Sequence, residues 1–91
     1  MIYDIYFNGI YKITADGTVS VFYPDAFKTL GLLFDNLGNL YATNYTTGTI
    51  TKITPSGVAS EFVSGLNGPV GLTSDYLGNI YTMTSKNYIK Y

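Results

Sequence analysis

Short stretches of apolar residues, or of apolar residues alternating with polar ones, follow one another along the chain. Residues 40–44 (LYATN) and 49–53 (TITKI) show this pattern and are rich in Ile, Thr and Tyr, which favour strands. No window carries a 3.6-residue apolar stripe long enough for a helix. The pattern therefore predicts an all-β chain of short strands.

Turn-forming residues separate these stretches. Residues 35–39 (DNLGN) and 14–17 (TADG) place Asn or Asp where a side chain caps a turn, and Gly where φ is positive. Residues 54–57 (TPSG) add a proline that sets φ early in the turn. Asp35 and Asp75 occupy equivalent turn positions, and we expect structural capping from both.

The chain repeats itself at a regular interval, which is the distance from Asp35 to Asp75. The matching positions are Gly31-Leu32 with Gly71-Leu72, Asp35 with Asp75, Gly38-Asn39 with Gly78-Asn79, Tyr41 with Tyr81, Ile13-Thr14 with Ile53-Thr54, Gly17 with Gly57, and Phe22 with Phe62. Ile2-Tyr3 also matches Ile80-Tyr81, at a distance that is two residues less than two full intervals. The missing two positions are assigned to the loop at 45–48 (YTTG).

A repeat of about 40 residues with four antiparallel strands is typical of a β-propeller blade. We expect one partial propeller domain over 1–91, divided into a partial blade at 1–30, a full blade at 31–70 and a partial blade at 71–91. The tyrosines at 3, 41 and 81 recur with the blades and are expected to pack, with the hydroxyl at the rim.

The chain is too short to form a closed propeller. It holds about 2.3 blades, whereas closed rings have about 4–8. The chain begins with Met1, and we expect copies of it to complete a ring as a dimer or trimer, which would bury the open sheet faces and edges. The alternative is that the remainder of a longer propeller completes it.

Three sequence elements resemble the NHL-type repeat and the related repeats of gluconolactonase-like (senescence-marker-like) propellers. They are Gly-Pro-x-Gly-Leu (68–72), Asp-x-x-Gly-Asn-Leu/Ile-Tyr (35–41 and 75–81) and Ile-x-Lys-Ile (50–53). The resemblance covers nearly the whole chain and implies a six-bladed ring. Members of these families include lactone hydrolases, lyases and platforms that bind protein or RNA, so the resemblance leaves the function open.

Composition narrows the classes of function. Charged residues make up 12% of the chain, below the ~25% usual for soluble domains, so we expect other protein surfaces to cover part of it. A net charge of −1 gives no electrostatic support for binding nucleic acid or an anionic membrane. The sequence has no cysteine and shows no signal-peptide pattern or membrane-spanning run, so a cytoplasmic location is the default expectation.

The sequence offers little support for a catalytic function. The chain has no histidine, which removes the usual general base and the commonest transition-metal ligand. The resemblance to the lactonase branch implies a metal on the ring axis, held partly by an Asn just before the Gly-Leu of the first strand. Leu30 and Val70 stand at the matching positions and offer no side-chain oxygen. We predict no catalytic residue, metal site or cofactor.

Two sets of recurring positions are candidate binding residues. Tyr6, Asn44 and Thr84 end equivalent strands near the ring axis, where relatives face their ligands; packing or an indifferent loop is the alternative. Lys12, Lys52 and Lys90 recur on the third strand of the blade. In a closed ring they would form a circle of ammonium groups that binds anions or RNA. The alternative is that they are solvated lysines that prevent edge pairing, and the net charge of −1 favours this alternative.

Three functions follow from the sequence. The preferred one is a non-enzymatic propeller module that assembles with itself into a structural or interaction scaffold. The second is a metal-dependent enzyme of the lactonase or lyase type, with a site at the propeller axis. The third is binding of RNA or another anion through the lysines.

Overall fold

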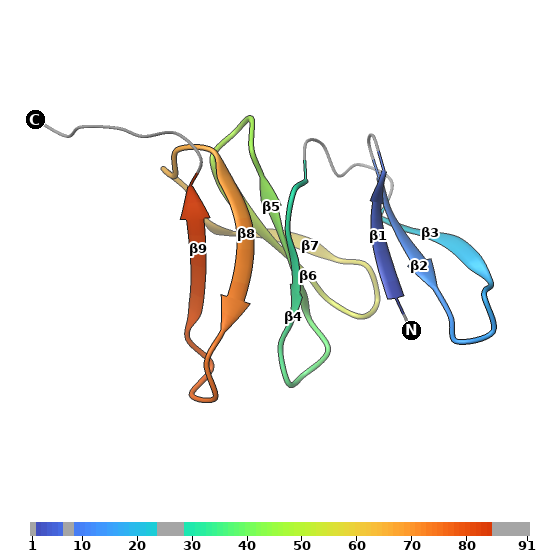
Figure 1. The fold of residues 1–91 in the computed structure, drawn as a ribbon. Coiled ribbons are helices and arrows are strands. Elements are labelled where there is room, and N and C mark those ends of the chain that lie inside the picture. The colour runs from blue at the N-terminus through green and yellow to red at the C-terminus, as the bar shows by residue number, and fades with distance from the viewer. Residues whose placement is uncertain (1, 7–8, 24–28, 85–91) are drawn as a thin grey trace, which may run out of the picture.

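The structure, a computed structural model, describes residues 2–6, 9–23 and 29–84 (Figure 1). These residues form nine strands and no helix. The strands are β1 (Ile2–Tyr6), β2 (Gly9–Ile13), β3 (Val19–Tyr23), β4 (Leu32–Phe34), β5 (Leu40–Asn44), β6 (Thr49–Ile53), β7 (Ala59–Val63), β8 (Pro69–Ser74) and β9 (Ile80–Thr84). The prediction of an all-β chain is confirmed, and the described residues include no helix that could cross a membrane.

The strands form three antiparallel sheets that stand side by side in Figure 1. Their orders are β1-β2-β3, β4-β5-β6-β7 and β8-β9. Within each sheet, every strand pairs with the next strand in sequence, as in propeller blades. The second sheet is a complete blade, the first has three strands, and the third has two strands within the described residues.

The internal repeat extends to the register of the sheets. β2 begins at Gly9 and β6 at Thr49, one interval further on, and a bulge occurs at Ile10/Tyr11 in the first sheet and at Ile50/Thr51 in the second. The connection from β1 to β2 spans residues 7–8, and the connection from β5 to β6 spans 45–48. The assignment of the two missing positions to this loop is therefore confirmed.

The core lies between the first and second sheets. Ile10 of the first sheet packs with Leu40, Ala42 and Ile53 of the second, and all four side chains are buried. Because side chains alternate along a strand, these residues of β5 and β6 define one side of the second sheet. We call the side that faces the first sheet the back face, and the opposite side the front face.

The front face of the second sheet meets the third sheet through Thr43. Its buried hydroxyl donates to the backbone oxygen of Val70 over 3.0 Å and accepts from the backbone N–H of Leu30 over 3.3 Å. Gly31 lies so close to the third sheet that a Cβ atom there would stand 2.3 Å from the Val70 oxygen. Glycine therefore permits the close approach of β8 to the second sheet.

The connections between strands lie at two opposite ends of the sheets (Figure 1). We call the end formed by the four turns that follow β2, β4, β6 and β8 the turn face, which comprises residues 14–18, 35–39, 54–58 and 75–79. Figure 1 shows these turns along the lower side of the molecule. Among the described residues, the opposite end carries the connection from β5 to β6 at 45–48 and the connection from β7 to β8 at 64–68.

Candidate functional site

The turn at 35–39 is built around one carboxylate. Asp35 Oδ1 accepts the backbone N–H groups of Leu37 and Asn39, each over 2.9 Å. Asp35 Oδ2 accepts the side-chain amide of Asn39 and the hydroxyl of Tyr41, each over 3.0 Å. Gly38 completes the turn with a φ of 84°, which a residue with a Cβ rarely adopts. We call this arrangement the Asp35 turn.

The turn at 75–79, which we call the Asp75 turn, makes the same bonds in the next blade. Asp75 Oδ1 accepts the backbone N–H groups of Leu77 and Asn79 over 3.0 and 2.9 Å. Asp75 Oδ2 accepts the Asn79 amide over 3.0 Å and the Tyr81 hydroxyl over 2.9 Å. The capping role predicted for both aspartates is confirmed. The packing role predicted for the recurring tyrosines is confirmed for Tyr41, which is buried, but not for Tyr81, which is 54% exposed; the Tyr3 side chain lies outside the described part.

Hydrogen bonding keeps these carboxylates ionised. The Asn39 side-chain amide, helped by the N–H groups of the turn and opposed by partial desolvation, lowers the pKa of Asp35 to about 2. The Asn79 amide does the same for Asp75, whose pKa also falls to about 2. Burial, and next the neighbouring Asp35, raise the pKa of Tyr41, so its hydroxyl stays protonated and donates to the carboxylate. The two turns therefore carry fixed negative charge at neutral pH.

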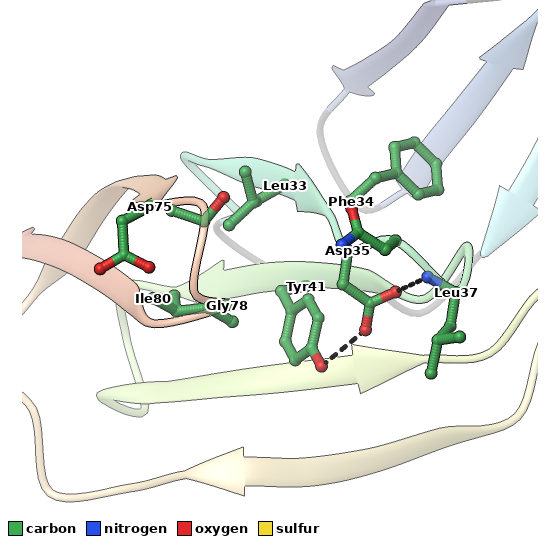
Figure 2. A pocket seen from close by; sticks show the side chains of 10 residues that line it. Leu33, Phe34, Asp35, Leu37, Tyr41, Asp75, Gly78 and Ile80 are labelled. Atoms are coloured by element: carbon green, nitrogen blue, oxygen red, sulfur yellow. Dashed lines mark hydrogen bonds between the residues drawn. The ribbon is translucent and has the colours of Figure 1, made fainter.

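A pocket of about 290 Å³ lies between the Asp35 turn and the Asp75 turn (Figure 2). Its lining comes from the ends of β4 and β8, the starts of β5 and β9, and the two turns. The lining residues are Leu33, Phe34, Asp35, Asn36, Leu37, Tyr41, Ser74, Asp75, Gly78 and Ile80. Figure 2 shows the Tyr41 ring on one side, Leu33 on another, and Ile80 with Gly78 opposite Asp35. The pocket thus combines apolar side chains with polar ones, including two carboxylates, and none of the described residues that line it is cationic.

Both aspartates could be identified from the sequence, whereas the pocket could not. It joins Leu33 to Ile80, which belong to different blades, and strand patterns alone do not show which residues of neighbouring blades meet. One signal in the sequence that could have indicated a binding site is the leucine that recurs at the tips of the Asp35 turn and the Asp75 turn. Leu37 is 81% exposed and Leu77 is 72% exposed, so neither side chain is needed to fill the core.

The three candidate ligand residues lie at the opposite end from the pocket. Asn44 is the last residue of β5, and its Oδ1 accepts the backbone N–H groups of Thr46 and Thr47, each over 3.1 Å. Thr84 is the last residue of β9 and is exposed. Tyr6 ends β1, but its side chain lies outside the described part. In Asn44 the side-chain oxygen caps a turn; a ligand role for these residues stays a prediction.

Two of the three candidate lysines lie inside sheets. Lys12 on β2 stands opposite Ser20, and Lys52 on β6 stands opposite Tyr41 and Ser60. β2 and β6 each pair with a strand on both sides, so the interpretation that these lysines prevent edge pairing is wrong. Both are half-buried on faces that turn toward the next sheet. Lys90 lies outside the described residues, and a circle of lysines stays a prediction.

Metal-binding groups are not clustered in the described part of the chain. Residues 2–6, 9–23 and 29–84 contain no group of three or more His, Cys, Asp or Glu side chains placed to hold an ion. At the positions that match the lactonase ligand, the Val70 backbone oxygen accepts the Thr43 hydroxyl, and Leu30 donates its N–H to that same hydroxyl. Their backbones thus join two sheets.

No family model matches the chain, and no curated protein matches it. Among solved structures, it is similar to the crystal structure of a catalytically inactive virginiamycin B lyase from Staphylococcus aureus with quinupristin. The TM-score is 0.68 and the sequence identity 23%, and the match covers 85% of this chain and 28% of the lyase chain. Since that lyase is a β-propeller, the comparison shows a propeller-like fold. The chain spans little more than a quarter of the lyase's length.

Proposed function

We propose that the chain is a non-enzymatic β-propeller module that packs against further blades and serves as a structural or interaction scaffold. The resemblance of its repeats to NHL-type repeats supports this function, because such blades serve widely as binding platforms. The observation that carries the proposal is a difference in exposure between positions that the repeat makes equivalent.

The front face of the third sheet exposes what the second sheet buries. Tyr41 is 5% exposed, whereas Tyr81, which makes the same hydrogen bond to its own turn aspartate, is 54% exposed. Thr43 is fully buried, whereas Met83 at the equivalent position is 74% exposed. The Tyr41 ring packs edge-on against Phe62 of its own sheet, and its neighbourhood also includes the third sheet. A further blade on β9 would cover Tyr81 and Met83 in the same way.

The back face of the first sheet shows the converse difference. Ile53 of the second sheet is fully buried and Ala59 packs against the same core, because the first sheet covers them. At the equivalent positions of the first sheet, Ile13 is half-buried and Val19 is exposed. The first sheet therefore presents an apolar back face that matches the covered back face of the second.

The front face of the third sheet and the back face of the first sheet match each other, because they are equivalent to faces that pack together between neighbouring sheets of the chain. A front face already packs against a back face where the first sheet meets the second, and again where the second meets the third. A second copy could place its back face on Met83 and Tyr81, which is a head-to-tail contact that forms a ring when the rotation closes. Two or three copies would complete it, and the remainder of a longer propeller would occupy the same faces if the chain belongs to one.

Matched charge substitutions test this contact. Met83→Asp places a carboxylate on the proposed interface, and Leu77→Asp places one at a turn tip of similar exposure that lies outside it. An unpaired charge in a packed interface is strongly unfavourable, so Met83→Asp should sediment as a smaller species than the parent chain. Leu77→Asp should sediment as the parent does. Identical sedimentation of both variants and the parent would contradict the proposed contact.

A lyase-like enzyme is the second candidate, because the solved structure described above is a lyase with a propeller fold. A metal-dependent enzyme would bind its ion in the native state and so be stabilised by it. The test is the melting temperature with millimolar Ca²⁺ or Mn²⁺. A rise would favour this candidate, and an unchanged melting temperature would count against a metal-dependent enzyme.

A further inference from the structure

The turn face carries apolar side chains that its turns do not require. Each aspartate caps its turn through the backbone N–H of Leu37 or Leu77, which any residue except proline would provide. Yet both leucine side chains extend into solvent, and Tyr76 beside Leu77 is 93% exposed. Leu37 also lines the pocket between the two turns (Figure 2), and Tyr76 and Leu77 belong to the Asp75 turn on its other side, so apolar side chains are exposed on both turns that border the pocket.

The same face is negatively charged. Its four turns contain three carboxylates, those of Asp16, Asp35 and Asp75, and no lysine or arginine. The Thr14 hydroxyl and the N–H of Thr18 lower the pKa of Asp16, so all three are ionised at neutral pH. The hydrogen bonds within each turn leave this net charge in place. This negative charge repels nucleic acid and anionic lipid and attracts a cationic partner.

The size of the pocket suits one side chain. At about 290 Å³ it lies just below the range of about 300–1,000 Å³ that holds drug-sized ligands. Its walls include Leu33, Ile80 and the ring of Tyr41, and the Asp35 carboxylate lies at the rim. Such a site favours an apolar or aromatic side chain that has positive charge next to it in the sequence.

We infer that the turn face binds a cationic, amphipathic peptide segment, whose apolar anchor enters the pocket between the Asp35 turn and the Asp75 turn. Leu37, which lines the pocket, contacts the anchor, the exposed Leu77 on the neighbouring turn contacts the adjoining part of the peptide, and lysine or arginine side chains on either side of the anchor lie near the turn carboxylates. This function goes beyond assembly, because the pocket is complete within one chain. It therefore does not depend on whether copies form a ring.

The test uses the full chain and an acetylated, amidated pentapeptide of lysine, phenylalanine, lysine, leucine and lysine. Titration followed by amide NMR should give saturable shifts at Leu37, Leu77 and the neighbouring turn residues. Raising NaCl from about 0.05 M to about 0.5 M should weaken binding, because the screening length shortens. A peptide with glutamate in place of each lysine should not bind, and one with serine in place of phenylalanine and leucine should bind at least about tenfold more weakly.

Variants of the chain locate the site. Leu37→Ser combined with Leu77→Ser should raise the dissociation constant about tenfold, because the anchor loses apolar contact. Leu30→Ser, an equivalent exchange at an exposed position of the opposite end, should leave it unchanged. If the double variant does not fold, the two control peptides on the parent chain decide the question. Equal binding of the cationic and anionic peptides, unsaturable shifts, or shifts confined to residues away from the turn face would overturn the inference.

Discussion

Replacement of Thr43 by valine tests the contact between the second and third sheets. Valine keeps the shape of the buried side chain but removes the hydroxyl that joins Val70 and Leu30. A buried polar group that loses its partner costs about 1–3 kcal/mol. Most of this penalty should fall on the Val70 backbone oxygen, because Val70 is half-buried whereas Leu30 is exposed. We therefore expect Thr43→Val to lower the free energy of unfolding by about 2 kcal/mol.

Urea denaturation, followed by far-UV circular dichroism at one fixed protein concentration, measures this effect. For a domain of this size, about 2 kcal/mol corresponds to a fall in melting temperature of roughly 10 °C. Thr46→Val is the control, since Thr46 is exposed in the connection between β5 and β6, and it should change the free energy of unfolding by less than about 0.5 kcal/mol. If Thr43→Val and Thr46→Val unfold at the same urea concentration, the hydroxyl does not join the sheets.

Two further predictions concern the core and the turns. Leu40→Ala should lower the free energy of unfolding by about 2–5 kcal/mol, because Leu40 is fully buried between the first two sheets. Leu37→Ala, at an exposed turn tip, should change the free energy of unfolding little. Equal urea midpoints for the two variants would show that Leu40 does not belong to the core. The Asp35 and Asp75 carboxylates have a pKa of about 2 in the folded chain, below the ordinary 3.8, so the stability they contribute should be complete above about pH 4 and lost as the pH falls toward 2. An acid titration by circular dichroism should show this loss for the parent chain, and unchanged stability from about pH 5 to about pH 2 would contradict it.

The sequence predicted the local features of the fold well. The turn at Asp35 could be predicted because the Asp, Gly and Asn that form it are close neighbours in the chain. The repeat then transferred this turn to Asp75. The hydrogen bond from Tyr41 to Asp35 could not be predicted in the same way, because it depends on how the turn places β5 against the carboxylate.

Contacts between different blades could not be predicted from local sequence patterns. Val70 offers a backbone oxygen to Thr43, and the residue type gives no sign of this role. Tyr41 is buried and Tyr81, at the equivalent repeat position, is half exposed. Tyr41 packs against Phe62 of β7 and faces the third sheet, whereas the described part of the third sheet has two strands, so the exposure depends on the surrounding strands rather than on the local sequence. The pocket was missed for the same reason, since Leu33 and Ile80 line it from separate blades.

The mass of the chain in solution, measured by light scattering over a range of concentrations, is the sharpest test of self-assembly. Two or three copies of the 10.0 kDa chain are expected in each particle, since the exposed front face of one copy covers the back face of the next. A folded particle of 10.0 kDa that persists at every concentration would contradict assembly of the chain with itself.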